Sequence, residues 1–259
     1  MSLIDPAHLQ TLLGPVTGRF DVDSLVLCGS TNSELLRRAE SGAPSGSVLV
    51  ADRQTAGRGR RGRQWFATPD SALMFSLLWR FPGQAGRLAG LSLAIGVAVA
   101  QALEALGVRD VGLKWPNDVL LGDGKLAGIL VELSAERRDT LAVIGIGLNL
   151  TVPDEPLPQA ASGLADVLAV IPDRHVVLAQ LLIALASVLD RFANGGFAAL
   201  QGAWQGRHAW QGKPVRVLLD DRREICGRCL GADEDGALLI ETSAGTERFL
   251  SGDLSLRPA

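Results

Sequence analysis

The sequence contains no tyrosine, three histidines and three cysteines, and aromatic side chains make up only 5% of its 259 residues. Three cysteines leave an odd thiol and cannot form a disulfide framework, which suits a reducing compartment better than secretion. The net charge of −3, from 25 basic and 28 acidic residues, excludes a generally basic surface that would attract nucleic acid or anionic membranes. We therefore expect a cytoplasmic protein in which any affinity for anions is local.

Long uncharged runs are also missing. The longest, 88–103, spans sixteen residues and includes Ser92, Gly96 and Gln101, whereas a membrane-spanning helix needs about 20 apolar residues. Its alanine, leucine and glycine content indicates a helix packed on several sides inside a large core. The N-terminus lacks the basic-then-apolar layout of a signal peptide. We expect no membrane association.

The hydrophobic period divides the chain into two parts. Up to about residue 210 helical and strand patterns are mixed, and after Gly212 the period shortens to about two. We therefore expect a larger domain over 1–210, with helices packed on a mixed α/β sheet, and a small β-barrel domain over 211–259. Helices are expected over 6–13, 87–106, 174–193 and 196–207, and strands over 24–28, 47–52, 72–80, 111–115, 118–121, 126–133, 142–150, 214–219, 224–230, 237–241 and 247–250.

Two short motifs predict local structure. Thr31-Asn-Ser-Glu34 fits the T-x-x-E capping box, in which the Thr hydroxyl and the Glu carboxylate each accept a hydrogen bond from a free backbone N–H. Gly122-Asp-Gly124 lies between two apolar runs and carries Asp-Gly, a strong hairpin signal. We therefore expect a helix that begins near Thr31 and a hairpin that joins 118–121 to 126–133.

The segment from Arg53 to Arg63 concentrates positive charge in a chain whose net charge is negative. It holds five arginines and no acidic residue in eleven positions, with glycines at 57, 59 and 62. Glycine leaves the backbone free to wrap a ligand and turn its N–H groups inward, and arginine forks hold phosphate or carboxylate oxygens in pairs. We expect this loop to bind an anion.

Three other interpretations of this loop remain. Gly57-x-Gly-x-x-Gly62 matches the dinucleotide fingerprint and follows a strand, but the residues after it do not begin a helix. An arm that grips nucleic acid is favoured by the nearby Trp65, which could stack on a base, and disfavoured by the absence of a second basic patch. A solvated charge run does not explain three glycines, because glycine costs chain entropy.

A second polar cluster follows a predicted strand. Lys114-Trp-Pro-Asn-Asp118 closes that strand, because proline lacks the N–H that a sheet needs, and Lys125 opens the next one. Around a hairpin, two cations and one carboxylate can face a common cleft. Gly145-Ile-Gly-Leu-Asn149 ends an apolar strand in a polar side chain, where buried strands usually present none. Each feature alone also fits an ordinary hairpin with solvent lysines or a turn asparagine.

Taken together and in order, these motifs resemble the biotin protein ligase family, the biotin–acetyl-CoA-carboxylase ligases. The resemblance runs from about residue 25 to Pro258 and implies a class II synthetase-like catalytic domain followed by an SH3-like β-barrel. Any one motif would be a weak signal, whereas six in one order are specific. They are Ser30-Thr-Asn32, Gln54 with Gly57-Arg-Gly-Arg-Arg-Gly62, Trp65, Lys114-Trp-Pro-Asn-Asp118, Lys125-Leu-Ala-Gly-Ile-Leu130 and Gly145 to Asn149.

The resemblance also implies a two-step reaction. Biotin and ATP, with Mg²⁺, would give biotinyl-5′-adenylate and pyrophosphate, and the biotinyl group would then pass to one lysine of the biotin carboxyl carrier domain of a carboxylase. The positions that resemble the biotin-binding set are Ser30, Thr31, Asn32, Gln54, Gly59 and Lys125, with Arg58 and Arg60 on the loop that closes over biotin and the adenylate. Trp65 and Asn149 resemble the adenine contacts, and Lys114, Asn117 and Asp118 the phosphate and magnesium side.

The catalytic candidates are therefore Arg58, Arg60, Lys114, Asp118 and Lys125. A carboxylate that attacks the α-phosphate meets like charge, and two unit charges about 4 Å apart repel by roughly 4 kcal/mol at an effective dielectric near 20. The cations and Mg²⁺ would offset that repulsion. In the second step the incoming lysine, of ordinary pKa about 10.4, must lose a proton. Asp118 is our candidate to assist; the alternative is that Asp118 only binds metal.

Some features depart from the family pattern. Gly29 stands where the family commonly has an acid, and Leu73-Met-Phe75 occupies a strand that often carries tyrosine. About 25 residues precede the match, too few for the winged helix with which bifunctional members bind operator DNA, so we expect no specific DNA binding. A sheet edge could pair two subunits into a homodimer, but nothing in the sequence selects between monomer and dimer.

Two alternative functions remain, and four residues outside the motifs receive structural interpretations. Lipoate or octanoate ligation is supported by the related fold, and a non-catalytic nucleic-acid-binding module would use Arg58 to Arg63. Cys226-Gly-Arg-Cys229 has no second pair and no nearby histidine in sequence, so we expect its cysteines on opposite faces of one strand, one of them in the core. Trp204 and Trp210 are expected to pack at the domain junction.

Overall fold

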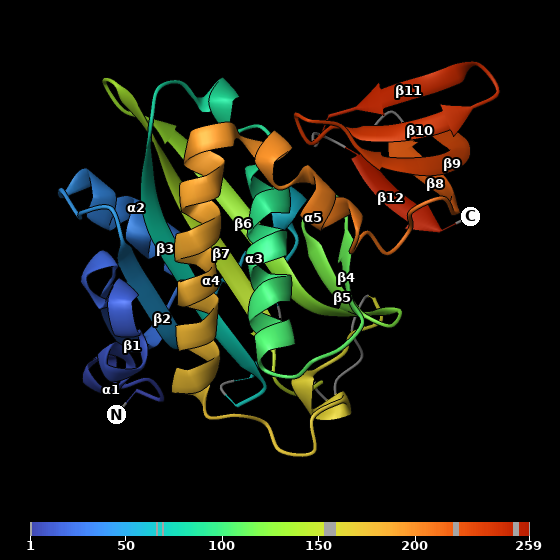
Figure 1. Ribbon diagram of the computed structural model, residues 1–259. Helices are drawn as coiled ribbons and strands as arrows, with labels where there is room; N and C mark the ends of the chain where they lie inside the picture. Colours follow the sequence, from blue (N-terminus) through green and yellow to red (C-terminus); the bar gives the residue numbers. More distant parts are fainter. Residues whose placement is uncertain are drawn as a thin grey trace.

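The structure is a computed structural model that describes residues 2–65, 67–68, 70–152, 159–219, 223–250 and 254–258. A large mixed sheet carries helices on one face, and a smaller sheet lies beside it (Figure 1). This mixed α/β architecture confirms the predicted class. The larger sheet has the order β1-β2-β3-β7-β6-β5-β4. Its strands are β1 (Asp21–Cys28), β2 (Ser47–Gln54), β3 (Ala72–Pro82), β4 (Val111–Lys114), β5 (Asp118–Leu121), β6 (Gly124–Ala135) and β7 (Asp139–Asn149).

One pair of neighbours in the larger sheet is parallel, and the other described pairs are antiparallel. The parallel pair is β1 with β2, and helix α2 (Thr31–Glu40) supplies the crossover that parallel pairing requires. The antiparallel strands β5 and β6 turn at Gly122, whose φ of +57° favours glycine. The predicted hairpin is therefore confirmed.

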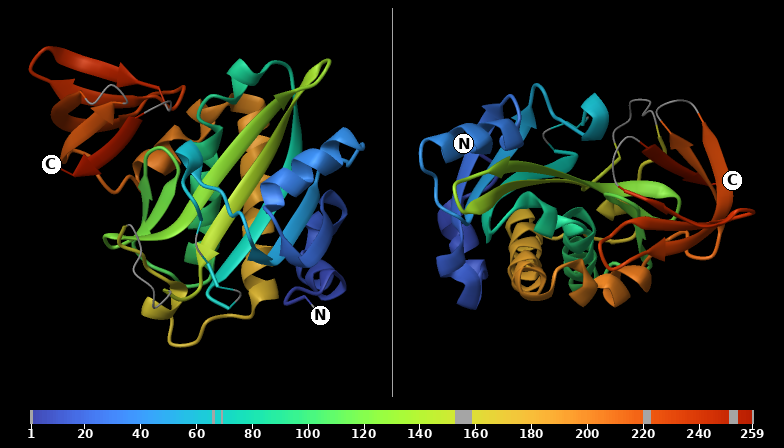
Figure 2. Two further views of the ribbon diagram at one scale, coloured as in Figure 1. Left: turned by 180° about the vertical axis from the view of Figure 1, so that it is seen from behind. Right: turned by 90° about the horizontal axis from the view of Figure 1, so that it is seen from above.

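Two long helices lie side by side across one face of the sheet (Figures 1 and 2). They are α3 (Leu91–Ala105) and α4 (Arg174–Gly195). By length and composition two segments, Ala85–Ala105 and Arg174–Gly195, could cross a membrane, but most of each is buried inside the fold, as in the core helices of a globular protein. Eleven of the fifteen residues of α3 are buried, which confirms a helix packed on several sides. It begins later than predicted because Gly90, at φ +75°, separates it from the 3-10 turn Ala85–Leu88.

The opposite face is covered only in part. There α2 packs over β2, β3 and β7, and its Leu35 meets Leu141 and Val143 in a small second core. Since side chains alternate along a strand, the next residues of β7 on this face are Gly145, Gly147 and Asn149, which lie beyond α2 and line a cavity. One face of β7 therefore packs against α2 at Leu141 and Val143 and then lines the cavity from Gly145 onward. The alternation of side chains along the strand is the same throughout.

The C-terminal region forms a five-stranded antiparallel sheet in the order β11-β10-β9-β8-β12. Four of the strands follow the predicted ranges, and a fifth is added at the end of the chain. Within the described residues the outer strands β11 and β12 do not pair, so the structure shows a sheet rather than a closed barrel. The strands are β8 (Pro214–Leu219), β9 (Glu224–Ala232), β10 (Leu238–Thr242), β11 (Gly245–Phe249) and β12 (Leu254–Pro258).

The remaining helical elements are short. The predicted helix 196–207 is wrong as one element, because Gly196 (φ +61°) and Leu200 (φ −120°) have non-helical backbone. In its place are a 3-10 turn and a short helix, α5. The short elements are α1 (Pro6–Leu12), η1 (Gly14–Arg19), η2 (Arg60–Gly62), η3 (Ala85–Leu88), η4 (Leu164–Asp166), η5 (Phe197–Ala199) and α5 (Gln201–Gln205).

The predicted capping box is also wrong. Helix α2 does begin at Thr31, but no side chain caps it. The hydroxyl of Thr31 lies 3.2 Å from Gln54 Oε1 and 2.7 Å from Ser76 Oγ, and the Glu34 carboxylate pairs with Arg37 and Arg38. The hydroxyl therefore serves a polar network instead of the helix end.

Candidate active site

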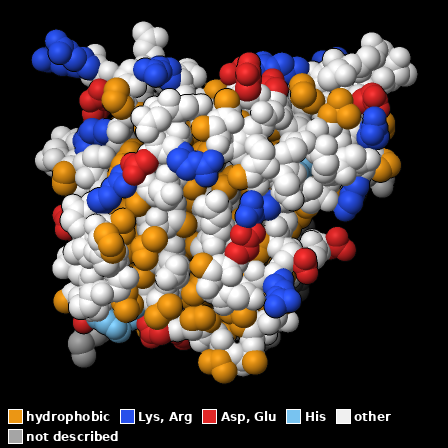
Figure 3. Space-filling model, in the orientation of Figure 1, with side chains coloured by type: hydrophobic (Ala, Val, Ile, Leu, Met, Phe, Trp, Pro, Cys, Tyr) orange, Lys and Arg blue, Asp and Glu red, His pale blue; other side chains and the backbone are white. Residues whose placement is uncertain are grey.

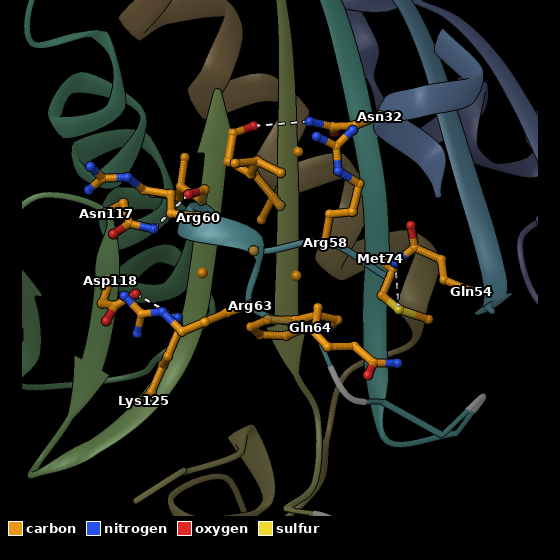
Figure 4. Close-up of a pocket in the computed structure, with 18 of the residues that line it drawn as sticks. Asn32, Gln54, Arg58, Arg60, Arg63, Gln64, Met74, Asn117, Asp118 and Lys125 are labelled. Carbon is orange, nitrogen blue, oxygen red and sulfur yellow. Dashed lines mark hydrogen bonds and ion pairs between the residues drawn. The ribbon is translucent and has the colours of Figure 1, made fainter. Parts of the chain in front are cut away.

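A cavity of about 450 Å³ lies on the open floor beside α2, between the larger sheet and the arginine-rich loop (Figure 4). Of the thirteen predicted site residues, Lys114 is the one that does not line it. Its Nζ lies 4.0 Å from Asp118 Oδ2, behind that carboxylate. The twelve that do line it are Ser30, Thr31, Asn32, Gln54, Arg58, Gly59, Arg60, Trp65, Asn117, Asp118, Lys125 and Asn149. The structure thus brings together residues as far apart in the sequence as Ser30 and Asn149.

One end of the cavity, here called the polar end, is made by Ser30, Thr31, Asn32, Gln54 and Ser76. Ser76 Oγ lies 2.5 Å from Asn32 Oδ1 and 2.7 Å from Thr31 Oγ1. Gln54 Oε1 accepts a hydrogen bond of 2.8 Å from the backbone N–H of Thr31. Ser30, Thr31, Asn32 and Ser76 are all buried. These neutral groups therefore hold one another in place, since buried polar groups require partners.

Glu132 ties the polar end to the arginine-rich loop. Its Oε2 accepts from Asn32 Nδ2 at 2.9 Å, and its Oε1 lies 2.8 Å from an Arg58 nitrogen. Asn32 must also approach β7 closely, because a Cβ on Gly145 would overlap Asn32 Oδ1. Glycine at 145 therefore makes room for Asn32.

The arginine-rich loop is folded back on itself over the cavity. The N–H of Gly59 donates to the carbonyl of Arg63 (2.7 Å), and that of Trp65 donates to Gly57 (3.0 Å). The turn uses positive φ at Arg61 (59°) and Gly62 (68°), where glycine is favoured. The loop side chains that point toward the cavity in Figure 4 are Arg58, Arg60, Arg63 and Gln64. The loop thus delivers guanidinium groups to an enclosed space, as its composition predicted.

The other end, here called the cationic end, is lined by Asp118, Lys125 and Arg257, and Lys114 lies beside Asp118 just outside the lining. Lys125 Nζ lies 2.6 Å from Asp118 Oδ1. Burial lowers the pKa of Lys114; the neighbouring Asp118 opposes this shift, and Arg257 and Lys125 add to it. Two lysines therefore pair with one carboxylate and Arg257 adds a third positive charge to this end, and an anionic ligand would relieve the repulsion among the three cations.

Trp65 lies between the two ends. Its indole packs so closely on β6 and β7 that a Cβ on Gly128 or Gly147 would overlap the ring, and Lys125 Nζ is 5.6 Å from the ring centroid. Its Nε1 is buried and has no hydrogen-bond partner among the described residues. The ring thus offers a flat apolar surface with one free donor.

Asn149 has a structural task at this site. Its Nδ2 donates to the carbonyls of Lys125 and Ser162, each at 3.1 Å. The amide therefore holds the start of β6, which carries Lys125, against the segment near 160. In the same way, Asn117 Nδ2 donates to the Ile129 carbonyl at 2.8 Å.

Sequence reasoning missed several lining residues. Arg63 and Gln64 belong to the loop that was recognised, and the alternating glycines of β7 could have indicated the cavity floor. No sequence pattern predicted Arg257 as a lining residue. It reaches the cavity because β12 pairs with β8 and the smaller sheet docks beside the pocket. The missed residues are Arg63, Gln64, Met74, Phe75, Gly128, Ile129, Leu130, Gly145, Ile146, Gly147, Gln159, Ala161 and Arg257.

Comparison with known proteins agrees with this arrangement. Residues 27–149 match the biotin/lipoate A/B protein ligase family, and residues 212–257 match the biotin protein ligase C-terminal domain. The bifunctional ligase/repressor BirA of Escherichia coli is 37% identical over 265 residues, which cover 100% of this chain and 81% of BirA. This chain belongs to the biotin protein ligase family.

Other biotin protein ligases match over most of their length. The biotin–[acetyl-CoA-carboxylase] ligase of Mycobacterium tuberculosis is 37% identical, over 94% of this chain and 91% of its own. The solved structure of the biotin protein ligase from Aquifex aeolicus in complex with biotin and ATP has a TM-score of 0.79 and 32% identity, and covers 92% of this chain and 99% of that one. The family that the ordered motifs resembled is therefore confirmed, and the residues that line the pocket lie within 27–149 except for Gln159, Ala161 and Arg257, the last of which lies in the matched C-terminal domain.

Proposed function

We propose that this protein is an ATP-dependent biotin ligase that activates biotin as biotinyl-5′-adenylate and then transfers it to a lysine of a biotin carboxyl carrier domain. The observation that carries the proposal is the division of one cavity into a neutral polar end and a cationic end. Biotin has the matching division, with a neutral ureido ring at one end and a carboxylate at the other. The names of the Mycobacterium and Aquifex relatives support biotin, ATP and an acetyl-CoA carboxylase as the partners of the reaction.

The polar end supplies both donors and acceptors for the ureido ring. Ser30 and Thr31 carry hydroxyls, and Asn32 and Gln54 carry amides with one donor and one acceptor group each. In this proposal they hold biotin with its carboxylate directed toward Lys125 and Arg60, both of which line the cavity. An octanoyl chain carries no ureido ring and so cannot exchange hydrogen bonds with these groups.

The first step is an attack by the biotin carboxylate on the α-phosphate of ATP. The new bond joins the carboxylate oxygen to phosphorus, and pyrophosphate leaves with the electron pair of the broken P–O bond. We assign Lys125, Arg58 and Arg60 to offset the repulsion between the carboxylate and the phosphate, and Lys114 to the phosphate side. Trp65 provides the surface for adenine. Preorganised cations at developing charge lower the barrier most where water is excluded.

Mg²⁺ enters this proposal with ATP as part of the substrate. Magnesium is commonly held by one or two carboxylates together with substrate phosphates and water. Asp118 is the one carboxylate that lines the described cavity, and it lies beside Asn117. The donor set therefore fits an ion held chiefly by the nucleotide, with Asp118 as its protein ligand.

In the second step the carrier lysine attacks the acyl carbonyl of the adenylate and AMP leaves. The amine must first lose a proton. We assign this assistance to Asp118, whose Oδ1 already contacts Lys125. The enzyme forms no covalent bond of its own with biotin.

We also infer the larger organisation from the family. Residues 1–210 would form a class II synthetase-like catalytic domain, and residues 211–259 an SH3-like barrel built on the five-stranded sheet. The three cysteines are all free thiols, which supports a cytoplasmic location. For the assembly, a homodimer is the alternative to a monomer.

The decisive experiment is release of pyrophosphate from ATP and Mg²⁺ by the purified protein, with biotin, lipoate or octanoate added in turn. We expect release with biotin alone, repeated turnover when a carrier domain is added, and loss of both with Lys125→Ala. Release with lipoate or octanoate in preference to biotin would replace the proposed substrate. If none of the three acids causes pyrophosphate release and the protein binds nucleic acid tightly and in a salt-sensitive way, the result would favour a nucleic-acid-binding module.

A further inference from the structure

The junction between the two sheets contains a buried polar cluster that the proposed chemistry does not use. His208 is 6% exposed. Its Nδ1 lies 3.0 Å from the Leu113 carbonyl oxygen in β4, and its Nε2 lies 3.1 Å from Cys229 Sγ in β9. The ring stacks on Trp204 of α5, with centroids 4.4 Å apart. One side chain thus joins a strand of each sheet and the helix between them.

The partners of His208 determine its protonation. A carbonyl oxygen only accepts, so Nδ1 carries the hydrogen. Nε2 then presents a lone pair, which accepts from the thiol of Cys229. Burial lowers the pKa of His208 and raises the pKa of Cys229, and both shifts favour the neutral forms. Both ring nitrogens are therefore used by a neutral imidazole.

Backbone hydrogen bonds on either side of His208 hold the chain next to Lys114. The Leu113 N–H donates to the carbonyl of Arg207 (2.7 Å), and the Ala209 N–H donates to the carbonyl of Leu113 (3.0 Å). The link between the sheets therefore runs parallel to β4 at this point. Trp210 follows, and its ring centroid lies 4.7 Å from Lys114 Nζ. A cation over an indole face is held by the ring's negative potential.

The smaller sheet reaches the cavity through this junction. Cys229 lies in β9, which pairs with β8, which pairs with β12. Strand β12 carries Arg257, which lines the cavity. A second tie is the hydrogen bond of 3.0 Å from Trp115 Nε1, just after β4, to the Gly236 carbonyl. The junction therefore sets Lys114 and Arg257 relative to Asp118.

We propose that His208 is a positioning residue for the nucleotide half of the reaction: through Leu113 and Cys229 it holds Lys114 and Arg257 at the cationic end. This inference rests on the proposed function. His208 touches no lining group of the polar end, so its loss affects ATP and leaves biotin binding unchanged. The role of the indole of Trp210 in this arrangement is to keep Lys114 over Asp118.

The test compares the KM values for ATP and biotin in biotin-dependent pyrophosphate release. His208→Ala raises the KM for ATP about threefold to tenfold, which corresponds to one buried hydrogen bond or cation–π contact, and changes the KM for biotin less than about twofold. His208→Asn keeps a donor for the Leu113 carbonyl and recovers part of the loss. Cys229→Ser keeps a donor for Nε2 and stays near the wild type, whereas Cys229→Ala does not.

Two controls separate positioning from folding. Leu9→Ala removes a fully buried side chain in α1; it lowers the melting temperature and leaves both KM values unchanged. If His208→Ala does not fold, Trp210→Leu tests the same path, with a raised KM for ATP that Trp210→Phe restores. Equal rises in both KM values, or an unchanged KM for ATP in the folded variants, overturn the proposal. A wild type without biotin-dependent release overturns the proposed function itself, and this inference with it.

Discussion

The two ends of the cavity are built in opposite ways. The polar end takes three consecutive residues, Ser30 to Asn32, and joins them to Gln54 and Ser76 in one neutral hydrogen-bonded network. The cationic end takes Lys114 and Asp118 from one hairpin, Lys125 from the next strand and Arg257 from the end of the chain. The hydrogen-bonding groups of the polar end are paired with one another, whereas the cationic end carries more positive than negative charge.

This difference separates shape recognition from charge recognition. A satisfied neutral network keeps its geometry without a ligand, so it can select a small polar ring by fit. An excess of partly buried cations is stabilised when an anion enters, because each cation loses solvent and gains a partner. We therefore expect substitutions at the two ends to affect different substrates.

Lys125→Ala gives the largest expected effect. It removes the cation that lies 2.6 Å from Asp118 and that would hold the reacting carboxylate and phosphate, so pyrophosphate release falls by about 10³-fold. Lys213→Ala is the matched control, because Lys213 is the third lysine of the chain and is exposed outside the cavity. Equal losses in the two variants would show that lysine at the cavity has no special role.

Asp118→Asn tests whether the carboxylate acts in one step or in both. We expect transfer from preformed biotinyl-adenylate to a carrier to fall by about 10²-fold near neutral pH, and to recover as pH rises and the carrier lysine loses its proton without help. The measurement is single-turnover transfer over a pH series, beside the rate of adenylate formation. If adenylate formation is abolished while transfer is intact, Asp118 binds metal only.

Two glycines of β7 separate the ends within one strand. A Cβ on Gly145 would overlap Asn32, whereas one on Gly147 would overlap Trp65. Overpacking of this kind costs about 1–3 kcal/mol, so we expect Gly145→Ala to raise the KM for biotin about tenfold and Gly147→Ala to raise the KM for ATP by a similar factor. Each variant is the other's control. The same change in both KM values for both variants would contradict the separation.

The sequence predicted the parts of this site that are local. The arginine-rich loop and the hairpin of Asp118 each carry their chemistry within a few residues, so composition and spacing indicated them, whereas the run Ser30 to Asn32 was assigned to the site only by the resemblance to the family. Arg257 could not be predicted from residues alone, because its neighbours are set by the pairing of β12 with β8 and by the docking of two sheets. Twelve lining residues were identified because they belong to motifs that are specific when taken together in their order, whereas Arg257 belongs to none of them.

The errors also have physical causes. Thr31 and Glu34 have the residue types of a capping box, but hydroxyls and carboxylates also serve polar pockets and surface ion pairs, and here they do. The predicted helix 196–207 has apolar residues at suitable spacing, but Gly196 at φ +61° ends α4 and lets the chain turn toward the smaller sheet. In both places tertiary contacts outweighed a local preference.

The smallest expected effect is a dependence of stability on acid pH at the junction that supports the cationic end. Burial lowers the pKa of His208 from its ordinary value of 6.5; the hydrogen bond to the Leu113 carbonyl opposes this, and Lys213 adds to it. The unfolded chain therefore binds more protons than the folded one between the two pKa values. The contribution of His208 to the free energy of unfolding is complete above pH 6.5 and is lost as pH falls toward the folded pKa. Urea unfolding between about pH 5 and pH 8 should give a flatter profile for His208→Asn than for the wild type. Parallel profiles for the wild type and His208→Asn would mean that the imidazole is not held neutral between the sheets.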